Sequence, residues 1–195
     1  QFKKEWGLLE KKALAPMPMH PASKVLHYAQ EIFEGLKVFK NSKGKLSIFR
    51  PEMNIKRMTY SAQMMAMPPF PEKLFLESLK DLSRSCMEWV PSEPGALYLR
   101  PTMIATSTAL GVAPADEYTF YTMASPVGGY FGSTDPKFAS KISVWISDQH
   151  IRAVRGGLGS AKTGANYAAS LRAVAHAKTM GHNNVLFLDA IERKY

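Results

Sequence analysis

Gly156-Gly157-Leu158-Gly159-Ser160-Ala161-Lys162-Thr163-Gly164-Ala165-Asn166-Tyr167 is the most informative segment of this 195-residue chain. It sets one lysine, Lys162, among glycines and other small residues, and Tyr167 follows five positions later, where a helical pattern begins. Glycine lets the backbone approach a ligand closely and adopt positive φ. A lysine that is partly desolvated there can lose its proton near neutral pH and attack a carbonyl carbon to form an imine. The alternative is a surface loop with a solvated lysine, and the rest of the chain decides between the two.

The composition is that of a globular protein, with 46% hydrophobic and 21% charged residues. No apolar run approaches the roughly 18 residues that span a bilayer, and no signal-peptide pattern opens the chain. The single cysteine, Cys86, cannot form an internal disulfide and has no partner for a cysteine-rich zinc site. We therefore predict a cytoplasmic protein with no membrane association and no metal site.

The net charge of +9 raises the possibility of nucleic-acid binding. The lysines and arginines are dispersed, however, and apolar and acidic residues interrupt their densest clusters. No zinc-finger or RNP-type motif accompanies them. We expect the charge to attract small anionic molecules, and we keep a basic nucleic-acid-binding domain as the alternative from another class.

The spacing of apolar residues predicts both helices and strands. Helical periodicity predicts helices at residues 22–34, 51–67, 71–90 and 166–180. Alternation predicts a hairpin with arms at 36–39 and 46–49, and further strands at 96–100, 103–106, 118–124, 141–147 and 184–188. The outline is an α+β domain over residues 1–127, a glycine-rich linker over 128–138, and the start of a second domain over 139–195.

Seven blocks of the sequence resemble, in the same order, those of the branched-chain amino-acid aminotransferases, which are pyridoxal-phosphate enzymes of the type IV fold. They lie at residues 26–28 with 32–37, then 49–51, 54–58, 98–101, 110–112, 126–131 and 162–167. The resemblance implies a mixed α+β chain with a two-domain fold whose second domain is truncated. It also implies transamination between leucine, isoleucine or valine and 2-oxoglutarate. D-amino-acid aminotransferase and aminodeoxychorismate lyase share the fold and remain alternatives.

The resemblance assigns the cofactor, pyridoxal 5'-phosphate, to three residues. Lys162 would carry it and then move a proton between the substrate Cα and the cofactor. Tyr167 would donate a hydrogen bond to the oxygen on the cofactor ring. Arg50 would hold the phosphate, since a guanidinium binds phosphate in a bidentate manner.

The resemblance also implies a substrate pocket and a homodimer. The residues that line the pocket would be Tyr28, Phe33, Tyr98 and Tyr130. Arg100 would bind the side-chain carboxylate of glutamate, whereas the aromatic walls suit aliphatic side chains. Leu110 and Val112 match a loop that the partner subunit contributes to the active site.

Several parts of the family's site lie beyond the residues that match. A glutamate facing the cofactor ring nitrogen, further phosphate ligands and threonines near the substrate carboxylate come later in the family, and Glu192 is too early to be that glutamate. We therefore expect that the chain is incomplete and that these 195 residues alone are inactive.

Overall fold

A computed structural model describes residues 1–128 and 142–195 of the chain. The predicted linker over 128–138 lies almost entirely outside these residues. The described part combines helices with a five-stranded antiparallel sheet and a smaller two-stranded parallel sheet, which confirms the predicted mixed α+β class.

The long strand β4 (Ala96–Ala105) organises the larger sheet. Along one edge it pairs with β1 (Glu31–Phe33) and then with β2 (Leu36–Lys40), which continues into β3 (Leu46–Ile48). Along the other edge it pairs over its whole length with β5 (Tyr118–Val127). Successive side chains of a strand point to opposite sides of a sheet, so each strand contributes side chains to both faces.

One face of this sheet forms the hydrophobic core. It packs against α2 (Pro51–Met64) and α3 (Glu72–Ser85), and a short 3₁₀ turn, η1 (Met87–Trp89), follows α3. The buried side chains of this core come from the sheet and from both helices and include Ile32, Val38, Leu97, Leu99, Met103, Ile55, Met58, Phe75 and Leu79. The opposite face therefore remains available for a site.

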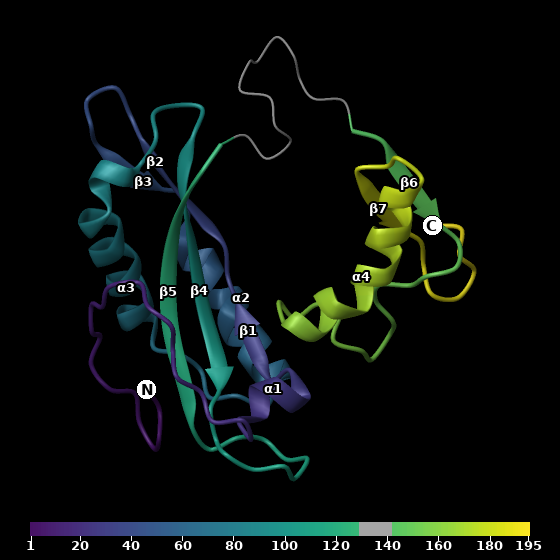
Figure 1. Ribbon diagram of the computed structural model, residues 1–195, viewed down its shortest axis with the longest axis horizontal. Coiled ribbons are helices and arrows are strands. Elements are labelled where there is room, and N and C mark those ends of the chain that lie inside the picture. The colour runs from purple at the N-terminus through teal and green to yellow at the C-terminus, as the bar shows by residue number, and fades with distance from the viewer. Residues whose placement is uncertain (129–141) are drawn as a thin grey trace.

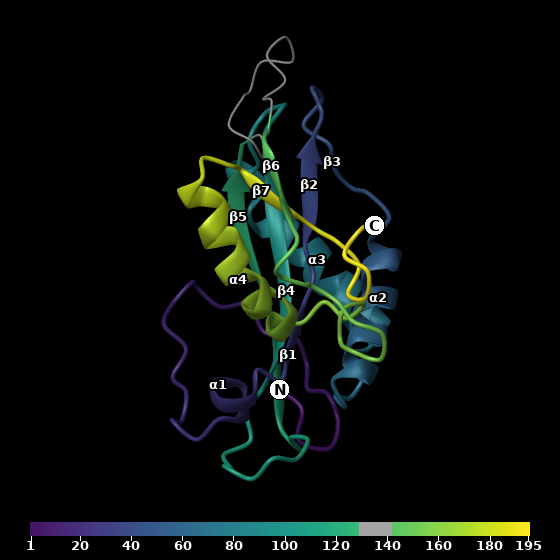
Figure 2. The same cartoon turned by 90° about the vertical axis from the view of Figure 1, so that its right-hand side faces the viewer.

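The larger sheet together with α1 (Lys24–Tyr28), α2 and α3 is the first unit, and a second unit lies on the opposite face of its sheet. It is a strand–helix–strand arrangement of β6 (Val144–Ser147), α4 (Gly164–Thr179) and β7 (Asn184–Phe187), with β6 and β7 parallel. Figure 1 shows α4 on the other side of the sheet from α3, and Figure 2 shows the same unit in front of the sheet. Gly181, with φ of +82°, ends α4 as predicted.

The predicted helix over residues 22–34 is wrong in its second half. The helix, α1 (Lys24–Tyr28), stops where Ala29 adopts a left-handed conformation with φ of 47°, and the chain continues as β1. Ile32 and Phe33 fit a strand as well as a helix, because Ile32 enters the core while Phe33 faces the other side. Pairing with β4 decides the outcome.

Strand β4 is also continuous where two strands were predicted. Pro101 lies inside it, opposite Thr122 of β5. On the other edge the carbonyl oxygen of Pro101 accepts a hydrogen bond from the backbone N–H of Glu34 at 2.8 Å. The proline thus keeps its acceptor satisfied, and the strand passes through it.

Candidate active site

The backbone of Lys162 is attached to the first unit. Its N–H donates to the hydroxyl of Ser61 on α2 at 2.9 Å, and its carbonyl accepts from the N–H of Phe33 on β1 at 3.0 Å. Ser61 is fully buried, which fixes the position of its hydroxyl. The glycine-rich loop therefore presents its lysine from a rigid support.

The side chains of Lys162, Tyr167 and Phe33 lie against one another. The Nζ atom of Lys162 lies 2.6 Å from the hydroxyl of Tyr167, which stands in the first turn of α4. The same Nζ lies 4.4 Å from the centre of the Phe33 ring. The ring centres of Phe33 and Tyr167 are 5.0 Å apart. A primary amine is thus held between the rings of Phe33 and Tyr167, with its nitrogen against the phenol oxygen of Tyr167.

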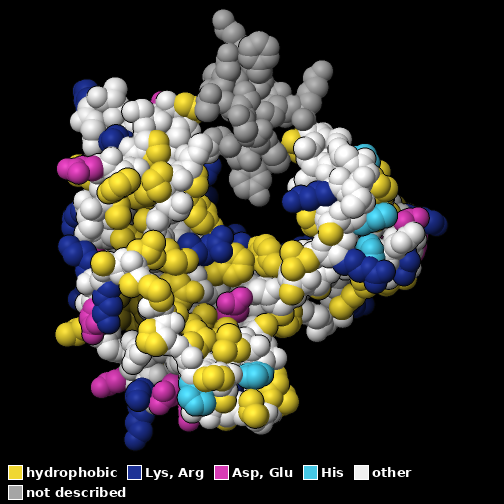
Figure 3. Space-filling model, viewed as in Figure 1, with side chains coloured by type: hydrophobic (Ala, Val, Ile, Leu, Met, Phe, Trp, Pro, Cys, Tyr) yellow, Lys and Arg dark blue, Asp and Glu magenta, His cyan; other side chains and the backbone are white. Residues whose placement is uncertain are grey.

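Arg100 and Tyr98 join this group from β4. The Nε and Nη2 atoms of Arg100 donate to the hydroxyl of Tyr98 at 3.0 and 2.9 Å. The guanidinium carbon lies 4.5 Å from the centre of the Phe33 ring. Gly35 leaves the space that Tyr98 needs, because a Cβ at this position would lie 2.3 Å from the phenol oxygen. Figure 3 shows basic and hydrophobic side chains together in the hollow between the sheet and the α4 unit.

Glu34 and Arg57 form an ion pair that the sequence did not predict. The Nε and Nη2 atoms of Arg57 donate to the two carboxylate oxygens of Glu34, both at 2.6 Å, and Asn54 donates to the same carboxylate at 2.8 Å. Glu34 is fully buried, whereas the Arg57 side chain is 50% exposed. The pKa of Arg57 is raised, chiefly by the hydrogen bond with Glu34, and the nearby Tyr167 adds to the rise.

A signal for Arg57 was present in the sequence. Asn54, Arg57 and Ser61 follow one another at the spacing of one helix face. They therefore form a polar stripe along one face of the helix, and in the structure Ser61 binds the backbone of Lys162 while the other two hold Glu34.

Arg50 occupies a different environment. It precedes α2 in a left-handed conformation with φ of 46°, and its side chain is 59% exposed. Its ion-pair partner is Glu52, at 3.9 Å. In the part of the chain that the structure describes, no hydrogen bond or ion pair joins Arg50 to Lys162 or Tyr167. A phosphate-binding role for Arg50 stays a prediction.

Tyr28, Leu110 and Val112 lie together at the far end of the β4–β5 hairpin. The hydroxyl of Tyr28 donates to the backbone carbonyl of Leu110. The side chains of Leu110 and Val112 are 65% and 87% exposed. Figure 1 shows this loop beside α1. Tyr130, the remaining predicted pocket residue, lies outside the described residues.

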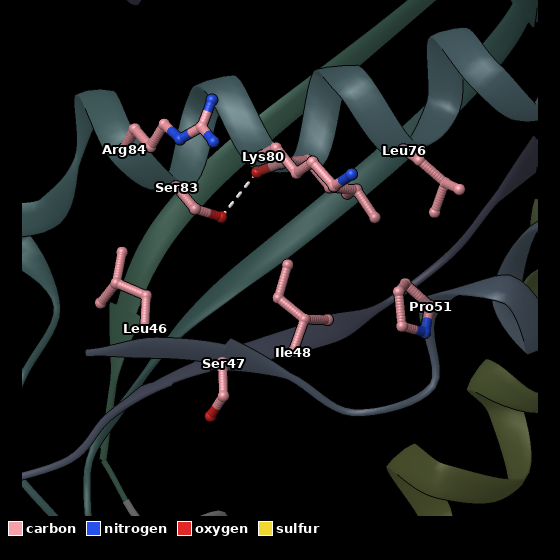
Figure 4. A pocket seen from close by; sticks show the side chains of 9 residues that line it. Leu46, Ser47, Ile48, Pro51, Leu76, Lys80, Ser83 and Arg84 are labelled. Carbon is pink, nitrogen blue, oxygen red and sulfur yellow. Dashed lines mark hydrogen bonds between the residues drawn. The ribbon is translucent and has the colours of Figure 1, made fainter.

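A groove of about 340 Å³ lies elsewhere, between β3 and α3 (Figure 4). It is on the helix-covered side of the sheet, away from Lys162. Its walls are Leu46, Ser47, Ile48, Pro51, Leu76, Leu79, Lys80, Ser83 and Arg84. It therefore does not contribute to the site around the lysine.

Within residues 1–128 and 142–195, no helix is long and apolar enough to cross a membrane.

The family model described as amino-transferase class IV matches residues 31–192. The chain belongs to the class IV aminotransferase family. The match begins at β1 and ends beyond β7, so both units of this class IV aminotransferase chain, including Phe33, Arg100 and Lys162, fall within it.

Similar proteins include two curated bacterial relatives. The chain is 47% identical over 182 residues to the branched-chain-amino-acid transaminase 1 of Bacillus subtilis, covering 93% of this chain and 50% of that one. It is 49% identical over 183 residues to the branched-chain-amino-acid aminotransferase of Mycolicibacterium smegmatis, covering 92% and 48%. The chain thus spans about half the length of the curated relatives it matches.

Solved structures also match this chain over about half of their own length. The T.th. branched-chain amino acid aminotransferase with pyridoxamine 5'-phosphate matches with a TM-score of 0.72 at 28% identity, over 89% of this chain and 55% of that one. The same enzyme complexed with N-(5'-phosphopyridoxyl)-L-glutamate matches with a TM-score of 0.70 at 26% identity, over 89% and 54%. The type IV aminotransferase fold, over about half of its length, is therefore the fold of this chain.

Proposed function

We propose that this protein transfers an amino group between leucine, isoleucine or valine and 2-oxoglutarate, with pyridoxal 5'-phosphate as cofactor. The observation that carries the proposal is the cluster around Lys162, in which an amine, a phenol 2.6 Å away and a guanidinium over Phe33 converge on one face of the sheet. The names of the relatives support the choice of substrates.

The residues of the cluster fit the cofactor. When bound, the cofactor supplies an electron-accepting ring that stabilises charge left on the substrate Cα. Lys162 offers the amine that its aldehyde requires, and Tyr167 offers a hydroxyl beside that amine. Lys162 Nζ would then be the group that takes a proton from the substrate Cα and returns it, because the Lys162 backbone is anchored to Ser61 and Phe33.

The phosphate needs a cation at a suitable distance from Lys162. Arg50 is the residue that the sequence predicts, but the geometry favours Arg57. Arg57 donates to Glu34 through Nε and Nη2, whereas its Nη1 makes no hydrogen bond within the described residues. The charge of the nearby Tyr167 also raises the pKa of Arg57. A guanidinium that is held in this way is well suited to an oxyanion.

The substrate side chain would lie against Phe33 and Tyr98. Burial of a leucine, isoleucine or valine side chain on such aromatic surface contributes about 1.5–3 kcal/mol. Arg100 would bind the side-chain carboxylate of glutamate, since its guanidinium is already oriented by the Tyr98 hydroxyl. One pocket can thus accept both kinds of substrate.

A second copy of the chain would complete the site. The exposed side chains of Leu110 and Val112 stand on a loop whose backbone is fixed by Tyr28. An exposed apolar loop with a fixed backbone is suited to contact a partner subunit. We therefore include a homodimer in the proposal.

The experiment that tests the proposal uses the full-length protein. It should carry the yellow cofactor and transaminate leucine with 2-oxoglutarate. Borohydride reduction followed by peptide mapping should place the cofactor on Lys162. A label on another lysine would contradict the assignment, and activity with D-amino acids or aminodeoxychorismate in a substrate panel would point to the same-fold alternatives. A colourless protein that is retained on a polyanion column in a salt-sensitive manner would favour nucleic-acid binding.

A further inference from the structure

Glu31 is an acidic residue at the edge of the site to which no role has been given. It opens β1 and lies opposite Ile104 of β4. Phe33 stands two residues later on the same strand, so both side chains are on the face that carries Lys162 and Arg100. The Glu31 carboxyl also lies against the first residue of α4, because a Cβ at Gly164 would be 2.0 Å from its Oε1 atom.

The position of Glu31 is well defined by its neighbours. The N-terminus of α4 carries partial positive charge and attracts a carboxylate. Strand β1 fixes the backbone of Glu31 through its pairing with β4. The side chain is half-buried between these two elements. A carboxylate is therefore held in a fixed place beside the pocket.

Arg100 is the cation that this carboxylate influences. Its close partners are the Tyr98 hydroxyl and the Phe33 ring, and among the described residues no carboxylate lies within ion-pair distance of it. Burial raises the pKa of Glu31, and the charge of Arg100 opposes that rise. Burial also raises the pKa of Tyr121, with Glu31 adding to the rise and Arg100 opposing it. Glu31, Arg100 and Tyr121 thus form one electrostatic group.

The two kinds of substrate make different demands on this group. An aliphatic side chain brings no charge, so the positive charge of Arg100 must be balanced by the protein. A side-chain carboxylate brings its own negative charge to Arg100 and meets repulsion from Glu31. Like charges brought together at a binding surface disfavour the ligand that carries them.

We propose that Glu31 is a specificity-determining residue, which balances Arg100 when an aliphatic side chain fills the pocket and weakens the binding of a side-chain carboxylate. This inference rests on the proposed function. It assigns to Glu31 the balance between the two substrate classes, whereas Arg100 accounts only for the acceptance of glutamate.

The test compares half-reactions of the full-length, cofactor-loaded protein with glutamate and with leucine. Glu31→Gln keeps the shape of the side chain and removes its charge. We expect the ratio of kcat/KM for glutamate to that for leucine to rise about tenfold, as expected when a like charge is removed. Glu77→Gln is the matched control, because Glu77 lies on α3 and pairs with Lys73 at 4.0 Å. It should leave the ratio unchanged.

Two further variants sharpen the result. Glu31→Asp withdraws the charge from Arg100 by one methylene and should shift the ratio in the same direction by about twofold. If Glu31→Gln does not fold, an unchanged ratio in Glu31→Asp overturns the inference. In an Arg100→Gln background, Glu31→Gln should change the ratio less than in the wild-type background, because only the direct repulsion of the substrate carboxylate then remains.

The outcomes separate this inference from the proposed function. A wild-type protein that reacts with neither leucine nor glutamate would overturn the function. A wild-type protein that reacts with both, together with a Glu31→Gln variant whose ratio is unchanged, would overturn only the role of Glu31. Equal gains or losses for the two substrates would show that Glu31 acts on the structure of the site.

Discussion

Arg57 differs from Arg50 in the residue that it pairs with. Its guanidinium is bonded to a fully buried carboxylate, Glu34, whereas Arg50 is paired with the exposed Glu52. A guanidinium that is oriented by a buried partner loses little freedom when it binds an anion. The surroundings of the two arginines therefore favour Arg57, and not Arg50, as the residue that binds the cofactor phosphate.

Arg57→Lys should weaken the binding of pyridoxal phosphate by about tenfold or more, because lysine keeps the charge but loses the bidentate geometry. Arg50→Ala, the matched test of the sequence prediction, should change the affinity less than about threefold, as for an exposed ion pair. Both affinities are measured by cofactor titration of the apoprotein. The reverse order would restore Arg50 as the phosphate ligand.

Thr163 follows Lys162 and carries a buried hydroxyl without a partner among the described residues. A buried polar group that makes no hydrogen bond is destabilising, so Thr163→Val should raise the free energy of unfolding of the apoprotein by about 1 kcal/mol. Urea unfolding measures this change. Thr179→Val is the control, because the Thr179 hydroxyl donates to the carbonyl of His176 at 2.7 Å. Thr179→Val should be neutral or destabilising. A loss of stability in Thr163→Val would show that the Thr163 hydroxyl has a hydrogen-bond partner in solution.

The environment of Glu31 also predicts that the free energy of unfolding depends on pH. Burial raises the pKa of its carboxyl in the folded protein. The ionised form therefore costs stability above the folded pKa, and this cost disappears as the pH falls below the unfolded value of about 4.3. Glu31→Gln should raise the free energy of unfolding at pH 7 by up to about 1 kcal/mol, because the side chain is half exposed, and should have no effect near pH 4. A gain of equal size at both pH values would exclude titration of Glu31 as its cause.

At the scale of elements, the turn between β1 and β2 determines the shape of the pocket. Gly35 stands in this turn, and a Cβ there would meet the hydroxyl of Tyr98 at 2.3 Å. Gly35→Ala should displace Tyr98 and, with it, the guanidinium of Arg100. We expect a loss of about tenfold or more in the glutamate half-reaction, since small displacements of a positioned group have large effects. Gly44→Ala in the β2–β3 turn, which has open space around it, should leave the half-reaction unchanged although its φ of +76° strains the turn.

The elements also show what the sequence could predict. Helices α2 and α4 and the β2–β3 hairpin follow from local periodicity and turn residues, and all three were predicted. The strand β1 was predicted as helix, because its conformation depends on pairing with β4, which lies far along the chain. Lys162 and Tyr167 are close in sequence and were predicted together. The Glu34–Arg57 pair was missed, because the burial of Glu34 depends on how α2 packs against the sheet.

At the scale of the whole molecule, we expect the β4–β5 loop to contact a partner subunit. Val112 is 87% exposed on a loop that Tyr28 holds in place. If this loop enters a partner subunit, Val112→Asp should weaken the dimer and reduce activity together, because a charge is costly in an apolar contact. Sedimentation of the full-length protein over a concentration series measures the first effect. Ser92→Asp adds the same charge at another exposed position and should have no effect. Unchanged association of Val112→Asp would place the interface elsewhere.

The attachment of Lys162 to the first unit has a consequence for the order in which the protein folds. The hydrogen bond to Ser61 closes a separation of 101 residues, and the bond from Phe33 closes a longer one. Contacts between residues so far apart in sequence form late, after local structure has reduced the entropy of closing the loop. The sheet and α2 must be in place before the glycine-rich loop can settle. The reactive amine is thus positioned last, and a polypeptide that has only partly folded does not yet present it to a carbonyl compound.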